Sequence, residues 1–229
     1  MGNFFSKALR YLKYTVIIFF LLSIFSVILF KYVNPPLTPL MVIRYFEYDN
    51  KNDDQKFEKE WESFDNISPN MILAIISAED NNFPTHFGID FEAIQKAHQL
   101  NKYNQNKHGG STITQQTAKN LFLTPSRTFI RKGFELYFTF LMETFWSKKR
   151  ILEVYLNIIE LGNGVYGIEA ASQYYFHKSA LKLTRNEAAL ITSVLPSPRK
   201  RNLTHPSAYM FYYQGRVLKL MSQIEKVDL

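Results

Sequence analysis

The sequence has no cysteine among its 229 residues. Disulfide bridges, thiolate metal sites and cysteine nucleophiles are therefore excluded. Glycine and proline are also scarce, with nine of each, which argues against a fibrous or low-complexity chain. No stretch shows the sustained alternation of apolar and polar residues that predicts β-strands. The G-x-x-x-x-G-K-S/T spacing of a nucleotide-binding P-loop is absent as well.

Apolar and basic residues are plentiful. Hydrophobic residues make up 46% of the chain and aromatic residues 16%, which is enough for a substantial core. The length suggests one domain with additional segments, because domains usually have about 100–200 residues. The formal net charge of +7 indicates an anionic partner. Nucleic acid, an anionic membrane surface and a phosphorylated substrate all fit that charge, which does not choose among them.

One uncharged apolar run lies near the N-terminus, from Tyr14 to Phe30. Its length is at the short end of the roughly 17–25 residues that cross a bilayer. A cleaved signal peptide is the alternative, but the run exceeds the usual apolar region of such peptides and no A-x-A-like site follows. Three basic residues precede it (Lys7, Arg10 and Lys13), so the positive-inside rule predicts a cytoplasmic tail over residues 1–13. We expect a transmembrane helix over 14–33 and export of the rest.

After this span the chain divides into two parts. Residues 34–66 begin with a proline-rich exit from the membrane and are interpreted as a juxtamembrane segment. Residues 67–229 show a succession of helix signals and are predicted to form the functional domain. Ser68, Ser111, Ser126, Ser147 and Thr184 are each placed to cap a helix N-terminus. The expected fold class is all-α.

Glu79 and Asp80 lie at the C-terminal end of the first predicted helix of this domain. The helix macrodipole is negative there, so a partly buried carboxylate would bind its proton more tightly and act better as a base. The alternative is that both carboxylates are simply solvated. His86 and Asp90 follow four residues apart, but two ligands are too few for a metal site, and structural hydrogen bonding is the better interpretation.

A second polar block follows a pair of glycines, Gly109 and Gly110. Within it, four polar residues share one face of a predicted helix: Thr112, Gln115, Gln116 and Lys119. Free amides at the N-terminus of such a helix could bind an anion. A solvated polar stripe accounts for the spacing equally well.

A third block places Arg127, Arg131 and Glu135 at successive steps of four residues, with Lys132 beside them. Such a face, with three cations and one carboxylate, suits a diphosphate. A salt-bridge ladder on a helix surface is the alternative.

Taken together, the blocks resemble glycosyltransferase family 51, the peptidoglycan glycosyltransferase module also found in class A penicillin-binding proteins. The matching patterns are E-D-x-x-F-x-x-H-x-G-x-D, G-G-S-T-I-x-Q-Q-x-x-K-N, R-K-x-x-E and I-L-E-V-Y-L-N, in that order. The resemblance covers roughly residues 67–203. The departures are slight: Thr114 stands where serine is common. The P-P-L-T-P-L-M stretch next to the membrane resembles the monofunctional enzymes of Gram-negative bacteria.

The resemblance implies a lysozyme-like, two-lobed helical domain that transfers a glycan from undecaprenyl diphosphate onto lipid II with inversion. Glu79 would be the catalytic base, and Glu135 would assist departure of the diphosphate. The implied substrate-binding residues are Asp80, Ser111, Thr112, Gln115, Gln116, Lys119, Asn120, Arg127, Arg131 and Lys132.

The resemblance also implies the surroundings of the enzyme. A divalent cation, Mg²⁺ or Mn²⁺, would be optional rather than obligatory. The partners would be lipid II, the lipid-linked glycan, the bilayer of the inner membrane and other cell-wall synthesis and division proteins, with no nucleic acid. The catalytic domain would lie on the periplasmic side.

Three other functions can be compared with this one. A lysozyme or lytic transglycosylase also uses a helical fold and a glutamate, but a neutral glycan needs no cationic stripe. A non-catalytic scaffold would have no need of both Glu79 and Glu135. A transpeptidase is not expected, because Ser197-Pro198-Arg199-Lys200 matches S-x-x-K without a K-T-G motif.

Overall fold

The computed structural model describes residues 2–47, 57–103, 109–126, 128–224 and 229. These residues are mainly helical, as expected. The α-helices are α1 (Gly2–Tyr32), α2 (Pro39–Phe46), α3 (Pro69–Glu79), α4 (Phe91–Tyr103), α5 (Ile113–Phe122), α6 (Phe129–Phe145), α7 (Lys148–Ile158), α8 (Ile168–Phe176), α9 (Arg185–Thr192) and α10 (Ala208–Met221). Two single 3-10 turns cover Phe64–Asn66 and Ala180–Lys182.

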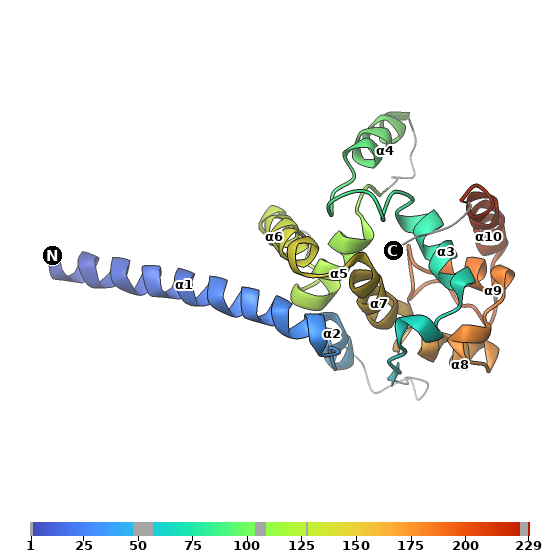
Figure 1. The fold of residues 1–229 in the computed structure, drawn as a ribbon, viewed down its shortest axis with the longest axis horizontal. Coiled ribbons are helices and arrows are strands. Elements are labelled where there is room, and N and C mark those ends of the chain that lie inside the picture. Colours follow the sequence, from blue (N-terminus) through green and yellow to red (C-terminus); the bar gives the residue numbers. More distant parts are fainter. Residues whose placement is uncertain (1, 48–56, 104–108, 127, 225–228) are drawn as a thin grey trace.

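Helix α1 is the elongated part of the molecule and projects away from the remaining helices (Figure 1). Within the described part of the chain it is the one helix long and apolar enough to cross a membrane, over Phe5–Tyr32. It continues through the basic residues that precede the apolar run, since lysine, arginine and leucine are good helix formers. Its second half lies along α6.

Two groups of helices lie on either side of α7 (Figure 1). Helices α5 and α6 pack on one another and α5 packs on α7, while α3, α9 and α10 pack together on the other side. Helix α7 lies at the centre of the domain, and its apolar residues are accordingly fully buried: Ile151, Leu152, Val154, Tyr155 and Leu156. The expectation of a two-lobed helical domain preceded by one apolar helix is therefore confirmed.

A small sheet of three strands joins distant segments, in the order β1-β3-β2. Strand β1 (Glu58–Lys59) pairs in parallel with β3 (Val165–Tyr166), and β2 (Glu160–Gly162) pairs antiparallel to β3. Strand β1 belongs to the segment over 34–66, which also contributes the buried Thr38 and Met41 to the domain. The strands are too short for an alternating pattern to be visible in the sequence.

Most of the predicted helix starts are confirmed. Ser68 accepts a hydrogen bond from the Asn70 amide and Ser147 from the Arg150 amide, and Thr184 forms a capping box with Glu187. Two predictions were wrong. Thr112, not Ser111, caps α5, because Gln115 three residues later completes its capping box. Thr128, not Ser126, caps α6, where it accepts from the Arg131 amide.

Candidate active site

A polar cavity of about 620 Å³ opens beside α5 and α7. One side carries Gln116, Lys119, Asn120 and Arg131, and Tyr155 also lines the cavity. A smaller hollow of about 290 Å³ contains Glu79, Asp80, Ser111 and Thr112. Gln116 connects the two spaces, because it lines the larger one and donates a hydrogen bond to Glu79 in the smaller one.

Glu79 is the last residue of α3. Its carboxylate accepts a hydrogen bond of 2.8 Å from Nε2 of Gln116. Burial raises the pKa of Glu79 above its ordinary value, while the Gln116 hydrogen bond and the charge of Lys119 oppose that rise. The direction agrees with the prediction from sequence, and the main cause is burial of the carboxyl. A carboxylate in this state is suited to accept a proton near neutral pH.

Asp80 has a different environment from its neighbour. Its Oδ1 lies 2.8 Å from Nε2 of His86, and its Oδ2 accepts a hydrogen bond of 2.9 Å from the Ile113 amide, the first of α5. Both oxygens of this buried carboxylate are thus held by protein groups, and Asp80 fixes the start of α5. Asp90 accepts from Asn82 and from the Ala93 amide, so His86 and Asp90 make structural hydrogen bonds.

The polar stripe of α5 divides into two parts. Thr112 and Gln115 are buried and satisfy each other's backbone amides in the capping box. Gln116, Lys119 and Asn120 line the cavity instead. The structure therefore brings part of the predicted substrate-binding set to the cavity and uses the other part to begin the helix.

The ammonium of Lys119 interacts electrostatically with both carboxylates, Glu79 and Glu135. Burial lowers its pKa, and so do Arg131 and Lys132, whereas the charges of Glu135 and Glu79 act to raise it. A partly desolvated ammonium near both carboxylates is well placed to bind an anionic group.

Glu135 is almost completely buried on α6. One of its oxygens accepts from Arg131 and the other lies 2.5 Å from Nζ of Lys132. Lys132 also reaches the exposed Ser111 at 3.4 Å. Arg131 and Lys132 thus form ion pairs with Glu135, and Arg131 lines the cavity at the same time. Arg127 lies outside the described residues.

Several cavity residues were not predicted. Tyr155 is fully buried and donates a hydrogen bond of 3.4 Å to Gln116, and its place in the I-L-E-V-Y-L-N run was the one signal for it. Arg44, Glu160, Arg199 and Lys200 line the far end of the cavity. Arg44 lies in the segment before the domain, where no motif points to it. Arg199 and Lys200 come from a turn after α9.

The residues present do not fit a protein-held divalent cation. No group of three or more His, Asp or Glu side chains in the described ranges could hold a metal ion. The Glu135 oxygens are both paired with cations.

The sequence is similar to those of known proteins. A family model described as Transglycosylase matches residues 47–222. Three similar proteins are described as biosynthetic peptidoglycan transglycosylases. The one from Bacteroides thetaiotaomicron is 47% identical over 220 residues, which cover 96% of this chain and 89% of that protein. The one from Caulobacter vibrioides is 46% identical, covering 100% and 98%. The one from Escherichia coli is 55% identical over 166 residues, covering 72% and 69%.

Proposed function

The chain belongs to the transglycosylase family, and on this premise we propose that it is a peptidoglycan glycosyltransferase of family 51. Its donor is a growing glycan on undecaprenyl diphosphate, and its acceptor is the undecaprenyl-diphosphate-linked disaccharide lipid II. The observation that carries the proposal is the pairing of Glu79, whose pKa is raised, with a cavity lined by Lys119 and Arg131.

Glu79 acts as the general base. It takes the proton from the 4-hydroxyl of the acceptor GlcNAc while the oxygen of that hydroxyl forms a bond to C1 of the donor MurNAc. The bond from C1 to the diphosphate oxygen breaks, and its electron pair leaves with the diphosphate. Base and leaving group on opposite faces of the sugar give inversion. Gln116 orients the Glu79 carboxylate through their hydrogen bond.

The cationic side chains stabilise the departing diphosphate. Lys119 and Arg131 line the cavity, and Lys132 is held near them by Glu135. Such preorganised charges act strongly where water is excluded. Glu135 positions these cations, because each of its two oxygens forms an ion pair, one with Arg131 and one with Lys132.

The apolar helix α1 gives the enzyme access to lipid-linked substrates. We place it in the inner membrane as a single-pass anchor, with the domain on the periplasmic side, because the basic residues precede the apolar run. We propose no transpeptidase activity, because the S-x-x-K match at Ser197 has no K-T-G motif to accompany it.

A lytic transglycosylase is the second candidate, since such an enzyme also has a helical fold and a catalytic glutamate. The cations around Lys119 disfavour it, because a neutral glycan presents no diphosphate.

The test is incubation of the purified, detergent-solubilised chain with lipid II, with and without a divalent cation. We expect glycan polymer and released undecaprenyl diphosphate. Cleavage of preformed glycan without polymerisation of lipid II would contradict the proposal.

A further inference from the structure

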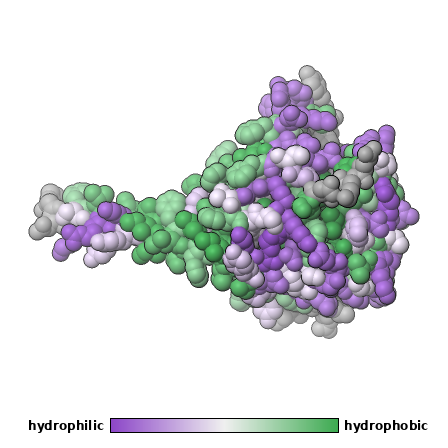
Figure 2. Space-filling view, viewed as in Figure 1, coloured by the Kyte–Doolittle hydropathy of each residue, from purple (hydrophilic) through white to green (hydrophobic). Residues whose placement is uncertain are grey.

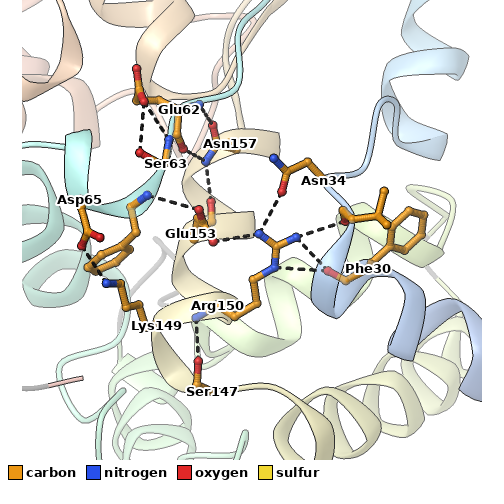
Figure 3. A network of polar contacts seen from close by, with 12 residues as sticks. Phe30, Asn34, Glu62, Ser63, Asp65, Ser147, Lys149, Arg150, Glu153 and Asn157 are labelled. Atoms are coloured by element: carbon orange, nitrogen blue, oxygen red, sulfur yellow. Dashed lines mark hydrogen bonds and ion pairs between the residues drawn. The ribbon is translucent and has the colours of Figure 1, made fainter.

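Helix α7 carries a polar face that the proposed reaction does not use, and Figure 3 shows Arg150 at its centre. The guanidinium of Arg150 points to the end of α1. Its Nε and Nη2 donate to the Phe30 carbonyl at 3.2 and 2.9 Å, and Nη2 also donates to the Val33 carbonyl at 3.1 Å. Nη1 donates to the side chain of Asn34 at 3.0 Å.

These contacts meet a specific need of α1. The last four carbonyls of a helix have no partner within it, and the helix dipole is negative at that end. A planar, permanently charged guanidinium can satisfy several such groups at once, which an ammonium cannot do with the same geometry. Arg150 therefore caps the C-terminal end of α1 from another helix.

Arg150 is itself held firmly. Its side chain is 13% exposed and pairs with Glu153 at 2.8 Å. The rings of Trp61 and Trp146 lie 5.4 and 6.0 Å from its guanidinium carbon. A charged group enclosed in this way keeps its geometry, because a rotation would leave buried polar atoms without partners.

The same face of α7 also binds the chain after residues 48–56. Glu153 accepts from the Phe64 amide at 3.2 Å. Asn157 accepts from the Glu62 amide at 2.7 Å and donates to the Glu62 carbonyl at 2.8 Å (Figure 3). Residues 150, 153 and 157 follow helical spacing, so one face of α7 fixes the chain both at the end of the anchor and where it enters the domain.

Further contacts hold α1 along its length. Ser23 lies 2.7 Å from the Tyr137 hydroxyl, and Nε1 of Trp146 donates to the Val27 carbonyl at 2.8 Å. The ring of Phe19 lies 5.5 Å from that of Phe134, the residue before Glu135. The anchor thus touches the helix that carries the second carboxylate.

We propose that Arg150 is a positioning residue, which locks the end of α1 onto α7 and makes the anchor a rigid strut. This inference rests on the proposed function, in which both substrates carry a diphosphate at the membrane surface. A strut holds Lys119, Arg131 and Glu135 at a set height and tilt above the bilayer, where the diphosphate is. With a flexible tether, the height and tilt of these residues relative to the bilayer would vary.

The first test measures geometry without any reaction. Because the chain has no cysteine, Leu12→Cys on α1 and Leu181→Cys on the domain, 60% and 49% exposed, can be spin-labelled in the full chain in vesicles. We expect a narrow distribution of label distances. It should broaden in Arg150→Lys and Arg150→Met, and to a smaller extent in Trp146→Phe, which removes one donor to α1. Lys149→Met is the control: Lys149 is also on α7, but its exposed ion pair is with Asp65 of the turn Phe64–Asn66, so the distribution should stay narrow.

The second test measures rates of the same variants. With a long-chain lipid-linked substrate in phospholipid vesicles, Arg150→Lys should lower the rate about 10- to 100-fold, because small misplacements of reacting groups are costly. With a short-chain, water-soluble analogue in detergent the rate should stay close to that of the unmodified protein. Both rates are expressed per amount of folded enzyme, so that a general loss of folding does not affect the comparison.

The outcomes separate the two proposals. An unchanged distance distribution in Arg150→Met, or equal losses of rate in vesicles and in detergent, would overturn the strut. If the unmodified chain polymerised neither substrate, the proposed function would fail, and the label distances would still decide whether Arg150 clamps the anchor.

Discussion

The chemistry of Glu79 depends on a balance between opposing effects on one carboxyl group. Burial raises its pKa, and the hydrogen bond from Gln116 and the charge of Lys119 lower it. Without the opposing pair, the pKa of Glu79 would lie higher and a smaller fraction of the carboxyl would be ionised at a given pH. Without burial, the pKa would lie lower and the carboxylate would be a weaker base. Gln116 therefore affects the protonation of Glu79 as well as its orientation.

We predict that Glu79→Gln lowers the initial rate of lipid II polymerisation by about 10²–10⁴-fold, because glutamine cannot accept the proton. The free energy of unfolding of Glu79→Gln should, in contrast, be higher than that of the unmodified protein. A raised pKa means that the ionised carboxyl destabilises the folded state above that pKa, and the effect disappears as the pH falls through it. Thermal unfolding should therefore show Glu79→Gln to be more stable at neutral and alkaline pH, with a smaller difference in acid. Near-normal turnover would rule out Glu79 as the base.

We also predict that Gln116→Leu moves the acidic limb of the rate–pH profile to higher pH. The lost hydrogen bond favoured the ionised form of Glu79, so the pKa rises further and less base is available on the acid side. Gln173→Leu is the matched control, because Gln173 donates a hydrogen bond of 2.8 Å to another carboxylate, Glu169, away from the cavity. An unshifted acidic limb in Gln116→Leu would show that the hydrogen bond does not tune Glu79.

Helix α5 owes its position to the contacts at its first turn. Thr112 caps the helix, and its hydroxyl donates a hydrogen bond of 2.7 Å to the Gly88 carbonyl. Asp80 accepts a hydrogen bond from the Ile113 amide. Gly88 has φ of +72°, and a Cβ there would lie 2.6 Å from Thr139. A residue other than glycine would be strained at this turn. The turn and the cap together decide where α5 presents Gln116 and Lys119.

We predict that Thr112→Ala lowers the free energy of unfolding by about 1–2 kcal/mol through loss of the cap. It should also reduce kcat of the remaining folded enzyme, because α5 carries Gln116 and Lys119. Thr112→Ser should restore both. Thr184→Ala removes the equivalent capping box from α9, and we expect a similar loss of stability with normal kcat. Equal kcat in the two alanine variants would show that the start of α5 does not affect the site. Denaturant titration and initial rates provide the measurements.

Apolar residues are exposed on α1 and on the neighbouring helix α6. Figure 2 shows them on α1 and on the adjoining part of the domain, where α6 lies in Figure 1. On α6, Phe129, Ile130 and Phe140 are 98%, 76% and 60% exposed. Because α1 packs on α6, a membrane around α1 would also meet this part of α6. Arg131, which lines the cavity, directly follows the exposed Ile130 on α6.

For the whole chain we predict a single orientation in the membrane. Residues 1–13 should be cytoplasmic and the domain outside, because the basic tail precedes the apolar run. Protease added to intact spheroplasts should digest the domain, while a cytoplasmic marker protein stays whole. Protection of the domain until the cells are lysed would reverse the topology.

The sequence by itself determined the elements and the chemistry that is local in the chain. Runs of apolar residues predicted the anchor, and serine or threonine before helix starts predicted most of the caps, because these signals act within a few residues. The order of the motif blocks identified Glu79 and Glu135 as the carboxylates of interest. The family resemblance, rather than spacing, carried that step.

The tertiary structure alone decided how these parts meet. It divided the polar face of α5 between capping, by Thr112 and Gln115, and the cavity, by Gln116 and Lys119, since helical spacing does not say what a face packs against. It brought Arg44 to the cavity and Arg150 to the end of α1. Such contacts join residues far apart in the chain, and they arise because buried carbonyls and charges need partners wherever packing brings them together.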